Sequence, residues 1–309
     1  MILLALAVTL PGVFWDSPPE SAPALREAGI KRIFVPAAAT GAWKNVAGIA
    51  VEAADLQQAA KLLTPAVNYR YEQASASRVP WLDCNGWRFL RQPQAHFYYD
   101  AAGPRAALAA AEAVAWGASA LIKTDGEGLK PLAQILDLAC GLESVEMRPA
   151  ADFESIDDRT AAAGEVMNLL VRNNLLFRVV LSPDPNLKLT VQLGNKNYPV
   201  DNAKNPAVMA QMVRGDLGDD NRSLRIFGSV VVVGRLESTP GRLRLHLINY
   251  DAARKVNGMR VRVMGEYGKH RVVAAGSPDA ALMDYTTGSG ATEFTLLELK
   301  TYAVIDLLR

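Results

Sequence analysis

The stretch PRAALAAAEAVAWGASALIKTD, residues 104–125, is the segment on which the predicted fold class depends most directly. Residues 104–116 are rich in alanine and carry apolar side chains at helical spacing, which predicts a helix. Residues 120–125 form a short apolar run that ends in Lys-Thr-Asp, which indicates a strand. A helix that leads into a buried strand is the repeating unit of a parallel α/β sheet.

The same alternation extends from residue 12 to about residue 145. Apolar runs predict strands at 12–16, 32–36 and 48–52, and helical patterns follow at 17–29, 55–63 and 130–140. A complete eight-stranded barrel takes about 250 residues. The four or five strand–helix units therefore predict an open parallel sheet or a partial, degenerate barrel-like domain.

Two segments depart from this alternation. Residues 79–91 contain Asn85-Gly86, a strong turn signal, between apolar runs, so we expect a β-hairpin there. Residues 146–160 are acidic and irregular, and we interpret them as a linker or a domain boundary.

The pattern changes after residue 160. Helical and strand patterns at 164–174, 177–181, 187–193 and 205–217 predict a small α/β unit. From residue 222 the chain consists of β-rich runs separated by turn residues at about ten-residue spacing, which is typical of an antiparallel β-sandwich. One run places Leu243, Leu245 and Leu247 on one face and Arg242, Arg244 and His246 on the other, and we expect the basic residues after 222 to form a solvated face. The predicted division is 1–150 for the barrel-like domain, 151–221 for the small α/β unit and 222–309 for the β-sandwich.

Composition and charge exclude several classes of protein. Half of the 309 residues are apolar and 21% are charged, as in globular proteins. The net charge of +1 provides no field that attracts a polyanion, so we expect no nucleic-acid partner. Since the longest apolar run falls short of the roughly 20 residues that span a bilayer, we expect no integral membrane segment.

Metal and cofactor sites are not expected either. The chain has only three histidines and two scattered cysteines, whereas a zinc site needs about four such ligands. No nucleotide-binding or metal-binding spacing is present. Cys84 and Cys140 are interpreted as small buried residues, with a disulfide between them as the alternative.

The first ten residues, MILLALAVTL, allow two interpretations. As the remnant of a signal peptide they indicate export, to the periplasm or the medium. As a buried first strand they leave the protein in the cytoplasm. Both locations stay open at this stage.

Acidic residues follow several predicted strands. Asp16, Asp100 and Asp125 each close an apolar or aromatic run, and Asp83 lies in the predicted hairpin. Parallel α/β folds bind ligands beyond the carboxyl ends of their strands, and glycoside cleavage uses two carboxyl groups about 5–10 Å apart. We therefore select Asp16, Asp83 and Asp125 as candidate acid and base residues. The alternative is that each aspartate caps a helix or stabilises a turn.

All five tryptophans lie within the first 116 residues. Flat aromatic faces stack well on sugar rings, although a packed α/β core also needs large side chains. The candidate ligand-binding residues are the aromatic ones together with two polar ones at strand ends: Trp15, Trp43, Trp81, Trp87, Tyr98, Asp100 and Lys123.

Residues 290–307 and 243–250 resemble the C-terminal antiparallel β-module of bacterial glycoside hydrolases. The order of parts is similar to that of the beta-galactosidase-type enzymes, which have a barrel-like α/β domain, a glutamine-amidotransferase-like unit and a β-sandwich. The resemblance implies carbohydrate as the ligand. No position matches the catalytic Asn-Glu pair of that family, so no catalytic residue is carried over.

Three functional hypotheses result. The first is a glycoside-hydrolase-like protein that acts on carbohydrate through paired carboxylates. The second is a non-catalytic carbohydrate-binding or structural protein with a degenerate pocket. The third is an unrelated α/β enzyme that uses its sandwich to form a homo-oligomer. Whether the protein is an enzyme stays open at this stage.

Overall fold

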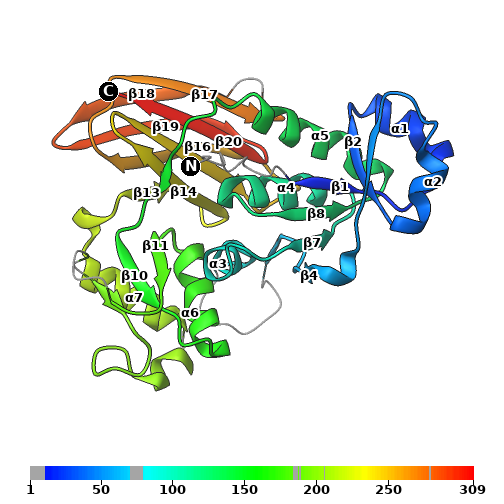
Figure 1. Cartoon of the computed structure of the whole chain (residues 1–309). Helices are drawn as coiled ribbons and strands as arrows, with labels where there is room; N and C mark the ends of the chain where they lie inside the picture. Colours follow the sequence, from blue (N-terminus) through cyan, green and yellow to red (C-terminus); the bar gives the residue numbers. More distant parts are fainter. Residues whose placement is uncertain (1–10, 70–78, 184–186, 188, 205, 278–279) are drawn as a thin grey trace, which may run out of the picture. The chain divides into compact units, whose positions relative to one another are not determined.

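The computed structural model describes residues 11–69, 79–183, 187, 189–204, 206–277 and 280–309 (Figure 1). The chain divides into two compact units. Unit 1 comprises Met1–Thr64 and Pro93–Leu142, and unit 2 comprises Pro65–Gln92 and Glu143–Arg309. Residues 65–92 thus group with the second half of the chain, whereas the predicted division into 1–150, 151–221 and 222–309 stays a prediction.

Unit 1 is built on a sheet of parallel strands in the order β3-β2-β1-β8-β7-β4. Its strands are β1 (Gly12–Phe14), β2 (Arg32–Val35), β3 (Ala50–Ala53), β4 (Ala60–Lys61), β7 (Phe97–Asp100) and β8 (Ala120–Lys123). β1, the first strand of this sheet in the chain, lies beside β8, the last one. Every other pair of neighbours consists of strands that follow one another in the chain once β5 (Ala66–Asn68) and β6 (Trp81–Asp83), which belong to unit 2, are left out. This is the strand order of a parallel barrel that is open between β3 and β4.

The short link between the two edge strands shows that this sheet is curled. About seven residue steps lead from Ala53 to Ala60, and they reach at most about 25 Å when fully extended. If the sheet were flat, its two edge strands would lie five strand spacings of about 4.8 Å apart, or about 24 Å. The link must also run back from the end of β3 to the start of the parallel strand β4. The edges can be joined only because the sheet curves, as in a barrel.

Helices connect these strands. They are η1 (Pro19–Ser21), α1 (Ala22–Glu27), η2 (Ala37–Ala39), α2 (Thr40–Trp43), η3 (Leu56–Gln58), α4 (Arg105–Trp116) and α5 (Gly126–Cys140). The alanine-rich α4 ends at Gly117, whose positive φ of 61° closes the helix in a left-handed cap. α4 and α5 pack side by side along the sheet (Figure 1).

The two faces of the curled sheet differ in burial. Val13, Ile33 and Ile122 are almost inaccessible on one face. Phe34 and Leu121, which point to the other face, are only partly buried. The second face is the one that a closed barrel would fill with side chains.

The helix predicted over 55–63 was wrong. Only Leu56–Gln58 is helical, as a single 3₁₀ turn, and the chain then joins the sheet as β4. The Asp55 side chain caps that turn by accepting from the Gln57 amide, and the Ala60 amide donates to the His96 carbonyl. Pairing with β7 therefore prevails over the local helical pattern.

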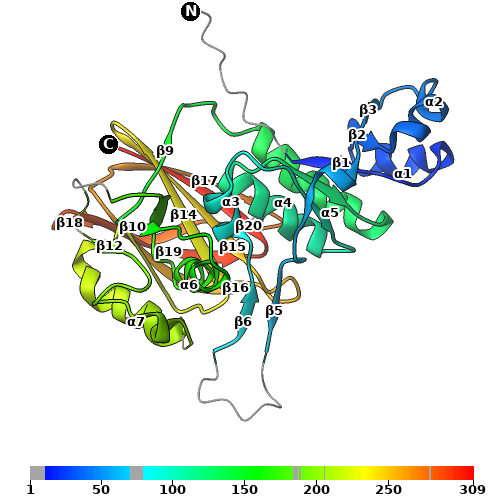
Figure 2. The ribbon, with the colours of Figure 1, turned by 60° about the horizontal axis from the view of Figure 1, so that its bottom comes forward.

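In unit 2, residues 65–92 form β5 (Ala66–Asn68), β6 (Trp81–Asp83) and α3 (Gly86–Arg91) (Figure 2). The hairpin predicted over 79–91 was wrong, since the Asn85 carbonyl accepts from the Arg88 amide and Gly86 begins a helix. The helix buries Phe89 and packs α3 on α6, and this tertiary packing outweighs the turn preference of Asn-Gly.

A small parallel sheet follows in the order β11-β10-β12. It consists of β10 (Phe153–Ile156), β11 (Phe177–Val180) and β12 (Thr190–Val191), accompanied by α6 (Ala161–Arg172), η4 (Val200–Lys204), α7 (Pro206–Leu217) and η5 (Asp219–Asn221). The linker predicted over 146–160 was wrong, because β9 (Arg148–Pro149) and the central strand β10 lie within it. Two of its acidic residues have partners: Asp152 accepts from the Ser223 amide, and Asp157 pairs with Arg91.

The last part of unit 2 consists of two antiparallel sheets. β13 (Leu224–Phe227), β16 (Val256–Met264), β19 (Ala291–Leu299) and β18 (Leu282–Gly288) form one sheet, and β17 (Lys269–Ala275), β20 (Tyr302–Leu308), β15 (Arg242–Asn249), β14 (Val232–Thr239) and β9 form the other. Side chains of both sheets share one apolar core, which includes Leu243, Leu245 and Leu247. The predicted fold class, parallel α/β followed by an antiparallel sandwich, is confirmed.

The basic face of β15 is not solvated, contrary to the prediction. Arg242, Arg244 and His246 are all buried. Asp306 accepts from both arginines, at 2.5 Å from Arg242 Nη2 and 2.7 Å from Arg244 Nε, and the Tyr302 hydroxyl lies 2.6 Å from His246 Nδ1. Burial of these groups is tolerable because each has a polar partner.

Candidate functional site

The carboxyl ends of β1, β7 and β8 bring four predicted residues together, and we call this group the rim. Asp16 follows β1, Tyr98 and Asp100 belong to β7, and Lys123 ends β8. In the β7–β8 register Asp100 lies opposite Lys123. Lys123 Nζ lies 2.6 Å from Asp16 Oδ2.

The electrostatics of the rim centre on the Lys123 ammonium. The hydrogen bond to Asp16 is the largest cause that raises the pKa of Lys123; burial opposes it, and the charges of Asp16 and Asp100 add to it. The side chains of Lys123 and Asp16 are 35% and 44% exposed, so the pair lies in contact with solvent. The arrangement therefore presents acceptors and a donor to an incoming ligand.

One rim residue was missed by the sequence analysis. Lys61 ends β4, and its Nζ lies 3.8 Å from Asp100 Oδ2. The wrong helix prediction over 55–63 hid the strand that positions this lysine. A correctly identified fourth strand that ends in Lys61 would have been the signal.

Three predicted residues of unit 1 have structural roles in the fold. The Trp15 indole is buried and donates from Nε1 to Ser21 Oγ at 2.8 Å, and Trp43 is buried as well. The Asp125 carboxylate caps α5 by accepting from the Gly128 amide at 2.9 Å, and it also accepts from the Gly103 amide at 2.9 Å. In this conformation neither indole offers a face to a ligand, and the Asp125 contact is the one expected of a helix cap.

The remaining predicted residues, Trp81, Asp83 and Trp87, belong to unit 2. Asp83 accepts from Asn68 Nδ2 at 2.7 Å across the β5–β6 pair. The Arg172 guanidinium stacks over the Trp81 indole at 3.6 Å from the ring centroid, a strong cation–π geometry. Trp87 packs against Gly164 of α6. The contacts of Trp81 and Trp87 join β6 and α3 to α6.

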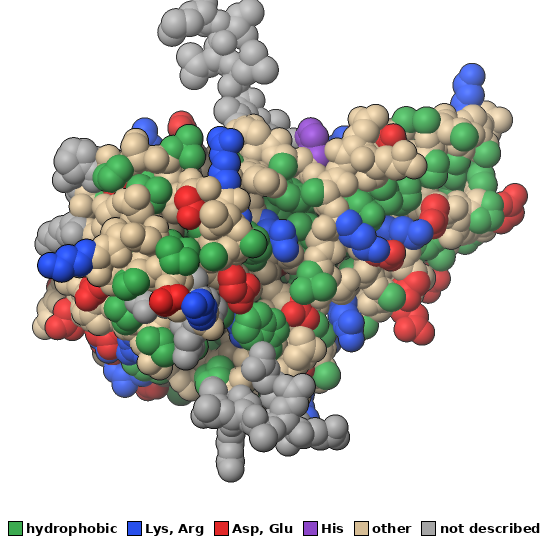
Figure 3. All heavy atoms as spheres, turned by 90° about the horizontal axis from the view of Figure 1, so that it is seen from below, with side chains coloured by type: hydrophobic (Ala, Val, Ile, Leu, Met, Phe, Trp, Pro, Cys, Tyr) green, Lys and Arg blue, Asp and Glu red, His purple; other side chains and the backbone are tan. Residues whose placement is uncertain are grey.

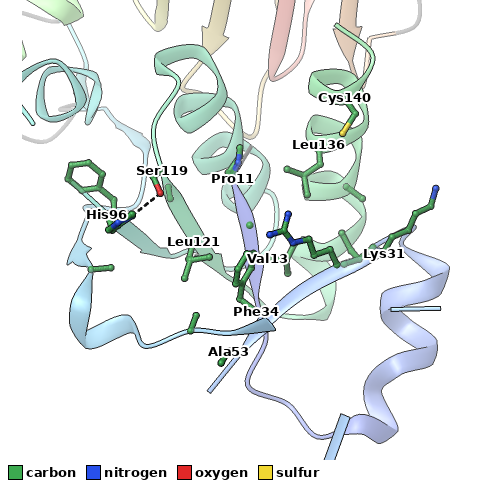
Figure 4. Close-up of a pocket in the computed structure, with 18 of the residues that line it drawn as sticks. Pro11, Val13, Lys31, Phe34, Ala53, His96, Ser119, Leu121, Leu136 and Cys140 are labelled. Carbon is green, nitrogen blue, oxygen red and sulfur yellow. Dashed lines mark hydrogen bonds between the residues drawn. The ribbon is translucent and has the colours of Figure 1, made fainter. Parts of the chain in front are cut away.

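Unit 1 also contains a cavity of about 790 Å³, which we call the amino-end pocket (Figure 4). It is lined by the starts of β1, β2, β7 and β8, by the carboxyl half of α5 and by the link 53–59. Phe34 and Leu121 contribute from the sheet, and Leu136 contributes from α5. The rim lies at the other end of the same strands.

In the described part of the chain, no three His, Cys, Asp or Glu residues come close enough to hold a metal ion. None of the helices among these residues has the length and apolarity required to cross a bilayer. Basic and acidic side chains are interspersed on the face that Figure 3 shows.

Comparison with known proteins supports a glycoside-hydrolase-like fold. No protein-family model and no curated protein sequence matches the chain. The structure of alpha-L-fucosidase isoenzyme 2 from Paenibacillus thiaminolyticus is similar with a TM-score of 0.53 and 9% identity, over 72% of this chain and 62% of that one. The present chain therefore spans about three fifths of the length of that enzyme.

Two further structures have TM-scores below 0.5. The exo-carrageenase GH42 from Bacteroides ovatus has a TM-score of 0.38 and 8% identity, over 84% of this chain and 48% of that one. A GH42 beta-galactosidase from G. stearothermophilus has a TM-score of 0.36 and 8% identity, over 96% and 60%.

Proposed function

We propose that this chain is a carbohydrate-directed protein that binds a sugar at the rim of unit 1. The observation that carries the proposal is the grouping of Asp16, Asp100, Tyr98 and Lys123 at the carboxyl ends of neighbouring parallel strands. Ligands of parallel α/β folds bind at this end of the strands.

The chemistry of the rim suits hydroxyl groups. Each sugar hydroxyl both donates and accepts hydrogen bonds. The carboxylates of Asp16 and Asp100 accept, the Lys123 ammonium donates, and the Tyr98 hydroxyl does both. A diol can therefore bridge a carboxylate and the ammonium without leaving either charge unsatisfied.

Hydrolysis is the second candidate function, and one observation favours it. Asp16 Oδ2 lies 2.6 Å from the Lys123 ammonium, and Asp100 lies opposite Lys123 in the β7–β8 register, so the rim holds two carboxyl groups beside one lysine. Glycoside cleavage requires such a pair. Binding is placed first because the ion pair already engages Asp16 at 2.6 Å, so a substrate must compete with Lys123 for that carboxylate.

The test is titration of a panel of mono- and oligosaccharides by calorimetry, with chromogenic glycosides as substrates in parallel. Asp100→Asn and Lys123→Met should weaken sugar binding by about tenfold or more, since a hydrogen bond to a charged group contributes about 1.5–3 kcal/mol. Glu27→Gln, an exposed carboxylate on α1, serves as the matched control.

The results separate the hypotheses. Sugar binding that both rim variants lose, without turnover, supports a binding protein. Turnover that is lost in Asp16→Asn and Asp100→Asn supports hydrolysis. Wild-type protein that binds no sugar, or rim variants that bind as well as Glu27→Gln, would contradict the proposal.

A further inference from the structure

The amino-end pocket is a second concave site that the proposed function does not use. Its volume of about 790 Å³ falls within the roughly 300–1,000 Å³ that small-molecule sites occupy. Side chains fill this region in a closed parallel barrel. Here the sheet is open between β3 and β4, and Phe34 and Leu121 remain partly exposed on its inner face.

The walls of the pocket are apolar and well packed against the backbone. Phe34 and Leu121 lie so close to Gly12 that a Cβ there would overlap the Phe34 ring and lie 3.0 Å from Leu121 Cδ2. These two side chains therefore lie flat on β1 and form a floor. Figure 4 shows Leu136 of α5 lining the cavity together with this floor. Such a surface favours an apolar ligand, because its contact with water is costly.

The positive and negative charges of the pocket lining balance. Lys31 and Arg32 are basic, and Asp55 and Asp137 are acidic. The Arg32 side chain already pairs with Glu52 at 2.7 Å, and Asp55 accepts from the Gln57 amide at 2.9 Å. A ligand with a net charge would thus gain little from the pocket and would lose its own hydration.

We propose that the amino-end pocket binds an uncharged, predominantly apolar small molecule with an aromatic or alkyl body. The two polar groups at one side, His96 and Ser119, lie 3.0 Å apart and offer a hydrogen bond to a hydroxyl or an uncharged aromatic amine on such a molecule. The pocket and the rim lie at opposite ends of the strands, so the test does not depend on carbohydrate binding.

The experiment titrates the full chain with two fluorescent probes of similar shape. N-phenyl-1-naphthylamine is neutral, whereas 1-anilinonaphthalene-8-sulfonate is anionic. We expect saturable binding of the neutral probe at one molecule per chain, and at least about tenfold weaker binding of the anionic one, because its charge must lose hydration.

Two variants of one helix locate the site. Leu136 of α5 lines the pocket and is only partly buried, so Leu136→Trp places a larger side chain in the cavity. This variant should weaken binding of the neutral probe by about tenfold. Leu138 is also partly buried on α5, but it lies two residues later, on another side of the helix, and is not part of the lining. Leu138→Trp is the matched control and should leave binding of the probe unchanged.

Alkylation provides a second measurement. Cys140 is a free, exposed thiol in the lining, whereas Cys84 is buried. The neutral probe should slow the reaction of Cys140 with iodoacetamide in the wild-type chain and in Leu138→Trp, but not in Leu136→Trp. Absence of saturable binding, equal effects of the two tryptophan variants, or unchanged Cys140 alkylation would overturn the proposal.

Discussion

The contact between α3 and α6 leads to a sharp prediction about Gly164. An ideal Cβ at this position would lie 2.8 Å from Trp87 Cζ3 and 2.8 Å from Arg91 Nη1. Arg91 is also held by Asp157, at 2.9 Å from its Nε and 2.7 Å from its Nη2. An added methyl group must therefore displace a packed indole edge and a guanidinium that is fixed by a bidentate ion pair.

The magnitude follows from two opposing effects. The higher helix propensity of alanine stabilises the folded state by about 1 kcal/mol relative to glycine. Overpacking a well-filled site destabilises it by about 1–3 kcal/mol. Disturbing the Arg91–Asp157 pair adds to the cost, because its side chains are only 14% and 7% exposed. We expect Gly164→Ala to lower the free energy of unfolding by about 1–2 kcal/mol.

Gly215 in α7 is the matched control. No heavy atom lies within 4 Å of its ideal Cβ, so Gly215→Ala should raise stability by about 0.5–1 kcal/mol. Urea unfolding followed by circular dichroism compares the two variants with the wild-type chain. If Gly164→Ala stabilises the protein as much as Gly215→Ala does, then the close packing of α3 on α6 is refuted.

Two other perturbations test the buried ion pairs and the assignment of Asp125. Asp306→Asn should lower the free energy of unfolding by about 3–5 kcal/mol, because buried Arg244 and Arg242 lose their shared carboxylate. Burial raises the pKa of Asp306, but hydrogen bonds from Arg244 and Arg242 prevail and lower it. The stabilisation is thus present above the unfolded-state pKa of about 3.9 and lost as the pH falls through the lowered folded-state pKa, so acid titration of the variant should lack this loss. Asp125→Ala should cost about 1–2 kcal/mol in unfolding experiments, because the α5 cap and the hydrogen bond from the Gly103 amide are both lost. Asp125→Ser should retain the α5 cap and sugar binding; loss of sugar binding in the serine variant would show that the carboxylate contacts the ligand.

The elements that local patterns determine strongly were predicted correctly. The alanine-rich segment before β8 is a helix, and the strict alternation of Leu243, Leu245 and Leu247 forms one side of the sandwich core. Three errors share a cause, namely that long-range packing prevailed over a local signal. Asn85-Gly86 begins a helix because α3 packs on α6, residues 60–61 join β7 as a strand, and the acidic segment 146–160 contains the central strand β10.

The candidate site was predictable in part. The position of Asp16, Asp100 and Lys123 at strand ends could be inferred from the apolar runs that precede them, and the parallel sheet brings these ends to one edge. The burial of Trp15 and Trp43 could not be inferred, since an aromatic residue beside a strand end is compatible with either a surface or a core position. Lys61 was missed with its strand.

The order of apolar and polar residues by itself determined the alanine-rich helix before β8, the alternating strand of the sandwich core, and that a parallel α/β part precedes an antiparallel sandwich. Only the tertiary structure decided that the first strand lies beside the last, that the barrel stays open between β3 and β4, and that Lys123 pairs with Asp16. The physical reason is that a hydrophobic pattern records which face of an element is buried, but not which distant element buries it. Both the rim and the amino-end pocket arise from that choice of neighbours.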